Sequence, residues 1–273
     1  MKKKISIIMN CHNGARYLNK SINSIINQNY KNWELIFFDN HSNDNSRQIA
    51  KGYKDKRIKF FKSNKFLSLY EARNLAVSKA TGRYICFCDT DDWWFKSKIK
   101  IQVNFIKKYK DINFVYSNLF VFNEKTKKKK LYFNTPMPSG KITQYLLNNY
   151  KLGILSVMMD RKLFINKKFN KKYNIIGDFD FFINLSLRQK FYCIQKPLGV
   201  YRMHDNNFSK KINIYAKEME NWLKINNFKF AKLKYSLINI KFTLFKLKLK
   251  NFFFFKIDEP RSQYIQQDQY YKV

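Results

Sequence analysis

Short apolar runs alternate with segments of helical period along the first hundred residues of the chain. The apolar runs predict four β-strands, at residues 5–9, 34–38, 58–61 and 84–88. The segments between them predict helices at 15–28, from Ser42 onward with Ser42 as the N-cap, and at 67–79. In the first helix, Leu18, Ile22 and Ile25 recur at the spacing of one buried face. This alternation is typical of βαβ units in a largely parallel sheet.

The pattern is less regular in the second half of the chain. It predicts a helix at 97–109, one or two strands within 113–123, a solvated hairpin turn at 125–130, a loop at 136–140, a strand at 155–159 and a helix at 179–188. Beyond Ser209, lysines mixed with large apolar residues predict a basic amphipathic helical segment. The residues from about Arg261 are polar, and we expect them to be poorly ordered.

Polar side chains follow three of the predicted strands at the point where each strand ends. Asn10 follows the first strand, Asp39 the second and Asp89 the fourth. In open α/β sheets, ligands bind outside the carboxyl ends of the strands. The sequence therefore predicts one shared site at this edge of the sheet.

Composition and charge narrow the class of protein. With 273 residues and 45% hydrophobic content, the chain can bury a sizeable core. Its net charge of +35 raises two alternatives without catalysis, a nucleic-acid-binding protein and a membrane-surface protein. The lysines are dispersed along the whole chain and accompany no nucleic-acid-binding motif, so we expect no nucleic-acid partner. No apolar run approaches the roughly 18 residues of a transmembrane helix.

The acidic turn Asp89-Thr90-Asp91-Asp92 carries the most specific chemistry. Such a turn can aim the carboxylates of Asp89 and Asp91 into the same crevice. Mg²⁺ usually takes one or two protein carboxylates and then binds substrate phosphates. The alternative is a solvated turn that caps the next helix. The position of the turn after a wholly apolar strand favours a site for Mg²⁺ or Mn²⁺.

Several motifs occur together in one order along the chain. They are the segments 5–14, 28–34 and 39–46, Glu71-Ala-Arg73-Asn74, Thr81-Gly-Arg-Tyr, Asp89-Thr-Asp91-Asp92-Trp, Gly177-Asp178-Phe179-Asp180 and Tyr201-Arg202-Met203-His204. In this combination the chain resembles glycosyltransferase family 2 over roughly residues 4–209. The resemblance implies the GT-A fold, an α/β fold with a Rossmann-like mixed, mostly parallel sheet flanked by helices.

The same resemblance implies a domain organisation. A catalytic domain at 1–209 would have a nucleotide-sugar half at about 1–110 and an acceptor half at about 111–209. The basic helical tail at 210–273 would be appended to it.

On the donor side, the resemblance implies roles for individual residues. Asp39 would read the base, commonly uracil, while Asn10 and Arg73 would lie against the nucleotide. Asp89 would contact the ribose or a metal-bound water, and Asp91 would ligate the metal. Asp92 is left with a structural role.

On the acceptor side, Asp178 would be the catalytic base. It would take the proton of the acceptor hydroxyl as that oxygen attacks the anomeric carbon, with inversion and no covalent intermediate. Asp178 also suits the N-cap of a helix that begins at Phe179, and both roles can hold. Asp180 competes as the base but lies inside the predicted helix on another face. His204 would lie near the diphosphate or metal, the alternative being an ordinary loop histidine.

The chain departs from the family pattern on both substrate sides. Asn10 stands where the family often has Pro, and Asn40 where it often has a second Asp. We therefore expect contacts to the base and ribose to differ. Gly177 stands where Glu commonly precedes the catalytic Asp, which removes one acidic neighbour.

The implied activity is a metal-dependent, inverting transfer of a hexose or N-acetylhexosamine from a nucleotide sugar, with UDP as the expected carrier. The acceptor would be a glycan or a lipid-linked sugar in surface polysaccharide or lipooligosaccharide synthesis. Residues 210–256 are expected to hold an otherwise soluble cytoplasmic enzyme at the anionic inner face of the membrane. The alternative is a helix packed on the catalytic domain with a solvated lysine face.

Overall fold

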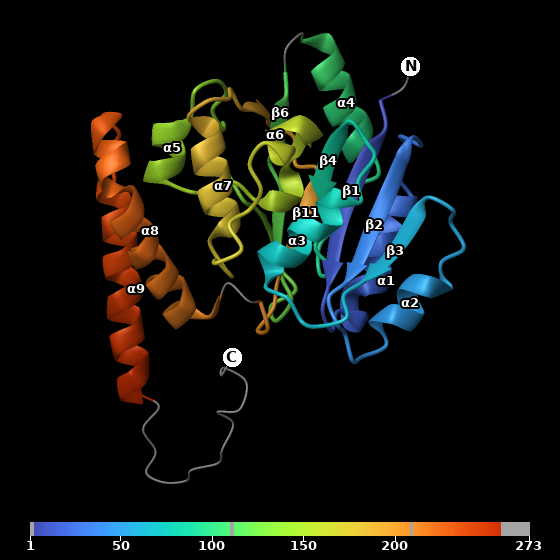
Figure 1. The fold of residues 1–273 in the computed structure, drawn as a ribbon, viewed down its shortest axis with the longest axis horizontal. Coiled ribbons are helices and arrows are strands. Elements are labelled where there is room, and N and C mark those ends of the chain that lie inside the picture. Colours follow the sequence, from blue (N-terminus) through green and yellow to red (C-terminus); the bar gives the residue numbers. More distant parts are fainter. Residues whose placement is uncertain (1–2, 110–111, 208–209, 258–273) are drawn as a thin grey trace.

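The chain folds around a seven-stranded mixed sheet (Figure 1). The structure is a computed structural model and describes residues 3–109, 112–207 and 210–257. β9 runs antiparallel to both of its neighbours, while the other neighbouring pairs are parallel, so the expected mostly parallel sheet is confirmed. In sheet order the strands are β10 (Tyr192–Ile194), β6 (Phe114–Ser117), β9 (Met158–Asp160), β4 (Tyr84–Phe87), β1 (Ile5–Cys11), β2 (Trp33–Asp39) and β3 (Ile58–Lys62).

Helices cover both faces of this sheet, because successive side chains of each strand point to opposite faces. Ile7 of β1 belongs to one core cluster, and its neighbour Ile8 belongs to the other. The first face is covered by α1 (Ala15–Ile26), α2 (Ser46–Gly52) and α4 (Lys98–Lys108). The second face is covered by α3 (Leu69–Ser78), α5 (Thr143–Asn148), α6 (Arg161–Ile165) and α7 (Gly177–Ser186).

A second, four-stranded sheet stands beside the first. Its order is β5 (Trp93–Trp94), β11 (Gly199–Met203), β7 (Phe120–Asn123) and β8 (Lys129–Leu131). The 113–123 segment therefore supplies two strands, one to each sheet. β7 and β8 form the hairpin whose turn was expected at 125–130, although Lys129 and Lys130 already belong to β8.

Two predicted elements differ from the structure. Ser42 does not begin α2, since its backbone N–H donates to Asp39 Oδ1 and its hydroxyl accepts from Asn13 N. The helix starts four residues later at Ser46. The strand expected at 155–159 begins as the 3₁₀ turn η1 (Ile154–Ser156), and only Met158–Asp160 pairs in the sheet.

The C-terminal segment forms a helical hairpin of α8 (Ile212–Lys232) and α9 (Ile238–Ile257), at the end of the molecule opposite β3 (Figure 1). α8 is part of the core rather than an appendage, since Met219, Trp222 and Phe230 are buried in the cluster that contains α7. Residue 209 is therefore no boundary of the core. In the described part of the chain, no helix is long and apolar enough to cross a membrane. The end expected to be poorly ordered, from Arg261, lies outside the described residues.

Candidate active site

The acidic turn follows β4 at the carboxyl edge of the large sheet, as the sequence predicts. Asp92 is 2% exposed, and its Oδ1 accepts the backbone N–H of Arg202 at 2.9 Å. Asp91 Oδ2 lies 2.9 Å from His204 Nε2 and accepts from Asn207 Nδ2 at 3.3 Å. The turn therefore binds the end of β11 through two of its carboxylates, and His204 lies beside Asp91 rather than in an unrelated loop.

Negative charge accumulates in this turn. Burial and the charge of Asp89 raise the pKa of Asp91, and burial and the charges of Asp91 and Asp89 raise that of Asp92 well above its ordinary value. A divalent cation would relieve this repulsion. Within the described residues no group of three or more His, Cys, Asp or Glu side chains could hold a metal. Asp91 with His204 nevertheless fits a Mg²⁺ or Mn²⁺ site that depends on substrate phosphates for its other ligands.

Arg73 on α3 connects the acidic turn with the second face of the sheet. Its Nη2 donates to both oxygens of Asp89, at 2.6 and 2.8 Å, while the Arg73 side chain is only 5% exposed. α3 begins immediately after Ser68, whose hydroxyl accepts from Glu71 N. Both oxygens of Asp89 thus accept from Arg73, while its side chain is 33% exposed and that of Asp91 is 21% exposed.

Asp178 lies in the first turn of α7 and contacts Tyr70 of α3. Tyr70 precedes Arg73 by three residues, which is about one turn of α3. The Tyr70 hydroxyl lies 2.9 Å from Asp178 Oδ1, and the Tyr150 hydroxyl lies 3.4 Å from Oδ2. Burial raises the pKa of Asp178 above its ordinary value, although the charge of Arg73 and the Tyr70 hydrogen bond oppose this rise. Tyr70 and Arg73 share one face of α3 and bring Asp178 and Asp89 into one site.

Gly177 explains how Tyr70 reaches Asp178. A Cβ at position 177 would lie 2.5 Å from the ring of Tyr70, which is closer than atoms can approach. The position where the family commonly has Glu is therefore occupied by the aromatic ring of another helix. Asp178 thus lacks the preceding Glu of the family pattern, and the Tyr70 hydroxyl donates a hydrogen bond to it instead.

α8 holds the turn that precedes Asp178. Glu218 accepts the backbone N–H groups of Asn174, Ile175 and Ile176 at 2.6, 2.9 and 3.1 Å. These N–H groups precede the first helical residue, Gly177, so Glu218 holds the turn that leads into α7. The predicted N-cap role of Asp178 is therefore wrong, because α7 begins at Gly177 and Glu218 satisfies the preceding N–H groups.

Asp180 lies on another face of α7, as predicted. Its Oδ1 accepts from Trp222 Nε1 of α8 and from Asn184 Nδ2, both at 2.9 Å. These bonds give Asp180 a structural role and leave Asp178 as the candidate base.

The predicted base-binding residues lie at the ends of β1 and β2. Asp39 is fully buried, with Oδ1 accepting from Ser42 N at 3.1 Å and Oδ2 from Arg47 Nε at 2.5 Å. Asn40 binds the backbone of Leu67 through both its amide atoms. By contrast, the amide nitrogen and oxygen of Asn10 are buried and have no hydrogen-bond partner among the described residues, and in native proteins such groups are rare.

Arg202 was missed as a functional residue, although it lies in the motif that contains His204. Its Nε donates to Asp91 O at 2.9 Å, and its guanidinium packs over the rings of Tyr17 and Trp93 at 4.4 and 4.9 Å. The signal was available in the Tyr201-Arg202-Met203-His204 motif. Tyr70, Tyr150 and Glu218 had no comparable signal, since each acts across more than 25 residues of sequence.

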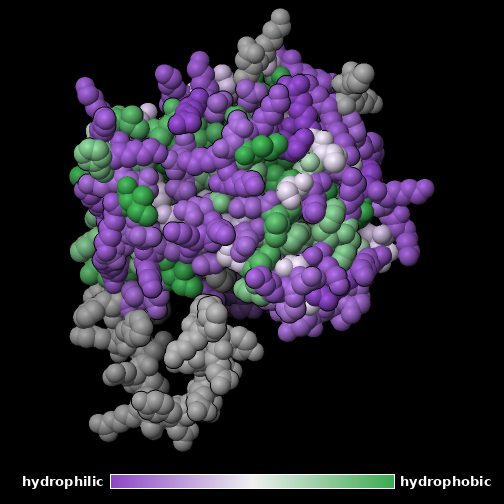
Figure 2. Space-filling view, viewed as in Figure 1, coloured by the Kyte–Doolittle hydropathy of each residue, from purple (hydrophilic) through white to green (hydrophobic). Residues whose placement is uncertain are grey.

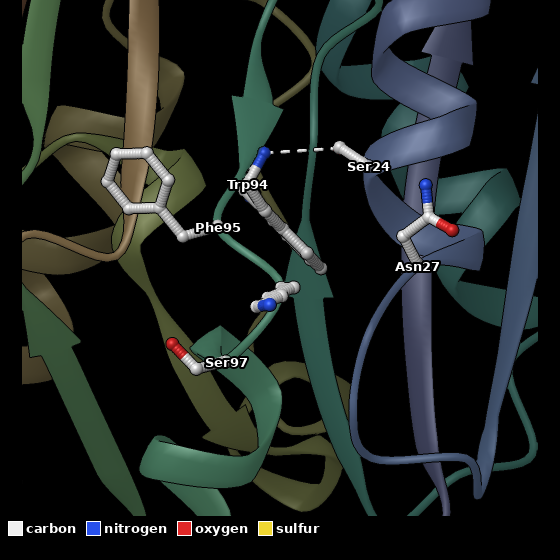
Figure 3. Close-up of a pocket in the computed structure, with 6 residues that line it drawn as sticks. Ser24, Asn27, Trp94, Phe95 and Ser97 are labelled. Carbon is white, nitrogen blue, oxygen red and sulfur yellow. Dashed lines mark hydrogen bonds between the residues drawn. The ribbon is translucent and has the colours of Figure 1, made fainter.

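Hollows lie at both ends of α1. One of about 610 Å³ borders His204 and is lined by Arg16 and Tyr17 of α1 and by the β7–β8 hairpin. The other, about 720 Å³, lies between the C-terminal end of α1 and the segment from Trp94 to Ser97 (Figure 3). Its lining contains no carboxylate, histidine or cysteine. The hollow beside His204 is therefore the one that adjoins the candidate chemistry.

Comparison with known proteins identifies the class. The sequence profile described as Glycosyl transferase family 2 matches residues 6–181. The chain belongs to this family. A UDP-Glc:α-D-GlcNAc-diphosphoundecaprenol β-1,3-glucosyltransferase of Escherichia coli is 37% identical over 160 residues, which are 58% of this chain and 61% of that protein. An uncharacterized glycosyltransferase of Methanocaldococcus jannaschii is 30% identical over 224 residues, covering 79% of this chain and 77% of that protein.

Solved structures show the same fold. Staphylococcus aureus TarS 1–349 in complex with UDP-GlcNAc has a TM-score of 0.65 at 16% identity and covers 81% of this chain and 66% of its own. The mannosyltransferase PcManGT of Pyrobaculum calidifontis, in complex with GDP-Man and Mn²⁺, has a TM-score of 0.60 at 14% identity, with coverages of 83% and 65%. This glycosyltransferase therefore has the GT-A fold that the resemblance implies.

Proposed function

We propose that this glycosyltransferase moves a sugar from a UDP-linked donor to a lipid-linked acceptor, with inversion at the anomeric carbon and with the help of Mg²⁺ or Mn²⁺. The observation that carries the proposal is the bridge made by α3, in which Arg73 binds Asp89 and Tyr70 binds Asp178. Asp89 on the donor side and the candidate base Asp178 are thus bound by two residues that lie one turn apart on α3.

On the donor side, Asp91 and His204 would hold the metal ion, with Asp89 as a second ligand or as a partner of its bound water. When bound, the ion neutralises the charge that develops on the leaving diphosphate. Arg73 orients Asp89, and Arg202 fixes the turn from the side of β11.

On the acceptor side, Asp178 would accept the proton of the attacking hydroxyl. A pKa raised by burial suits this task, because a more basic carboxylate takes the proton more readily. No second carboxylate close to Asp178 is required, since inversion in one step forms no covalent intermediate with the protein.

The base of the nucleotide would lie at the ends of β1 and β2. Asp39 would accept from a uracil N–H after Arg47, whose side chain is 37% exposed, moves away from it. The partnerless amide of Asn10 would be satisfied by the nucleotide, which gives that buried group a function.

The acceptor class comes from the relatives. The named activity of the Escherichia coli relative joins glucose from UDP-Glc to GlcNAc-diphosphoundecaprenol, and a second Escherichia coli protein with the same named activity is 38% identical over 117 residues. We extend this acceptor class to the present chain and with it a role in surface polysaccharide synthesis, in which residues 210–256 bring the enzyme to the inner face of the cytoplasmic membrane.

A direct test combines a panel of UDP-sugars, and GDP-Man as a control, with a GlcNAc-diphosphate lipid, with and without Mn²⁺. The proposal expects metal-dependent release of UDP and a new β-linked disaccharide on the lipid. Asp178→Asn should bind the donor as before and lose about 10²-fold or more in turnover. Full turnover in Asp178→Asn, or transfer from GDP-Man alone, would contradict the proposal.

A further inference from the structure

Helix α9 carries two apolar stripes on opposite faces. The inner stripe includes Ile240 and Leu244, which pack against the core cluster that contains α8. The outer stripe consists of four exposed residues spaced by four, three and four positions: Ile238, Phe242, Phe245 and Leu249. That spacing places all four on one face of the helix. Their side chains are between 41% and 69% exposed, so within the described residues nothing covers the outer stripe.

Lysines flank the outer stripe on both sides. At about 100° per residue, Lys241 and Lys248 fall roughly 70–90° to one side of the centre of the stripe, and Lys246 and Lys250 fall roughly 70–110° to the other. The sequence of α9 contains no acidic residue. Glu220 of α8 forms an ion pair with Lys248, with 2.9 Å between the carboxylate oxygen and the lysine nitrogen. The face is thus apolar along its centre and positively charged along both margins.

The space-filling view shows hydrophobic side chains lying between hydrophilic ones along the edge formed by α8 and α9 (Figure 2). Among the described elements α9 packs on α8 and α5, and the inner stripe lies in the core cluster that both helices share. The second stripe of α9 is therefore not required for its packing on α8.

We infer that the outer face of α9, from Ile238 to Leu249, is the surface with which this enzyme binds an anionic lipid bilayer, the helix lying in the plane of the membrane. Apolar side chains between lysines suit the boundary between acyl chains and headgroups, where lysine stems lie along the apolar region and their ammonium groups reach the phosphates. The inference rests on the proposed lipid-linked acceptor, and it centres the membrane contact within residues 210–256 on the continuous stripe of α9. Ile225 and Phe228 of α8 are also exposed, at 64% and 80%, while the opposite face of α8 is buried in the core.

Charge argues against two other occupants. A second copy of α9 on the same face would place lysine rows against lysine rows, and the sequence of α9 has no acidic residue to compensate, since Glu220 of α8 already pairs with Lys248. A nucleic acid would pair with the lysines but would leave the row of exposed apolar side chains in water. An anionic bilayer satisfies both kinds of residue at once.

Vesicle flotation of the full-length protein tests the surface without any need for catalysis. Vesicles of phosphatidylcholine alone are compared with vesicles that contain about one third phosphatidylglycerol, at low and high salt. The stripe variant is Phe242→Gln/Phe245→Gln, matched by Tyr109→Gln/Ile165→Gln, which removes exposed apolar side chains elsewhere. The charge variant is Lys241→Gln/Lys246→Gln, matched by Lys54→Gln/Lys56→Gln with the same net charge. Thermal unfolding is measured for all four variants to check that each one folds.

The wild-type protein should bind the anionic vesicles and lose binding at high salt. The stripe variant should bind on the order of tenfold more weakly, since two large apolar side chains no longer enter the bilayer. The charge variant should lose about fivefold per lysine, and both controls should bind like the wild type.

Equal binding by the stripe variant and its control would overturn the inference, as would equal binding to neutral and anionic vesicles. So would dimerisation or nucleic-acid binding that depends on Phe242 in place of vesicle binding. The two proposals fail separately. Sugar transfer by a protein that ignores vesicles overturns the surface alone, whereas vesicle binding through α9 without any transfer to lipid-linked acceptors overturns the proposed function alone.

Discussion

Removing one hydroxyl group, in Tyr70→Phe, tests how the candidate base is tuned. The Tyr70 hydroxyl has a single proton and two acceptors, Asp178 Oδ1 at 2.9 Å and Ile175 O at 2.8 Å. Burial and the charge of Asp178 raise the pKa of Tyr70 well above its ordinary value, so the phenol stays protonated through the working range. Its hydrogen bond favours the ionised form of Asp178 and lowers the pKa of that carboxyl.

The magnitude follows from the hydrogen bond. A bond to a charged acceptor contributes about 1.5–3 kcal/mol, and sharing the proton with Ile175 O leaves about half of this for Asp178. Since 1.36 kcal/mol corresponds to one pKa unit, loss of the hydroxyl should raise the pKa of Asp178 by about one unit. The acidic limb of kcat/KM should therefore move up by about one pH unit in Tyr70→Phe, with up to about a tenfold loss below the limb and recovery at high pH.

The assay is UDP release during transfer, measured from pH 5 to 9. Tyr150→Phe removes a longer, 3.4 Å contact to the same carboxylate and should shift the limb less. Tyr53→Phe, whose hydroxyl contacts Asn19 far from Asp178, should leave the profile unchanged. A loss in Tyr70→Phe of the same factor at every pH, or a shift of the limb to lower pH, would refute the assignment of Asp178 as a base tuned by Tyr70.

Three other perturbations have defined outcomes. Asp91→Ala should abolish Mn²⁺-dependent nucleotide binding measured by calorimetry, while metal-independent binding persists, and retained metal dependence would exclude Asp91 as a ligand. Gly177→Ala should destabilise the fold by about 1–3 kcal/mol, because the new Cβ would overlap the Tyr70 ring, whereas Gly52→Ala, where a Cβ meets nothing, is the neutral control in thermal unfolding. Glu34→Gln should cost about 2 kcal/mol at pH 7. Burial alone would raise the pKa of Glu34, but hydrogen bonds from Lys4, Lys59 and Ser6 lower it overall, so this stability is present above the ordinary glutamate pKa and is lost as the pH falls. A deficit that grows toward low pH would contradict that account.

The sequence predicts those parts of the molecule that depend on local pattern. The alternation of apolar runs and helical segments locates β1 to β4 and their helices, and the acidic turn is found where β4 ends. These features follow from the periodicity of side chains along a single element, which is readable without knowledge of the partner.

Other features depend on which segments meet in space. The antiparallel insertion of β9 between β4 and β6 has no periodic signature. The contact of Tyr70 with Asp178 spans 108 positions, and it is possible only because Gly177 has no side chain. The buried face of α9 could not be predicted from the sequence either. Its apolar residues lie on two opposite faces, and the pattern alone does not show which of the two packs on the core.

The hydrogen bonds from the backbone of residues 174–176 to Glu218 also bear on when the enzyme becomes active during its synthesis. The turn that carries Asp178 toward Tyr70 is held by a helix that leaves the ribosome more than thirty residues later. A nascent chain that ends near residue 209 already contains every residue proposed for catalysis, yet it lacks the carboxylate that holds that turn. Chains that end before Glu218 should therefore be inactive toward acceptors, although they contain the acidic turn and Asp178.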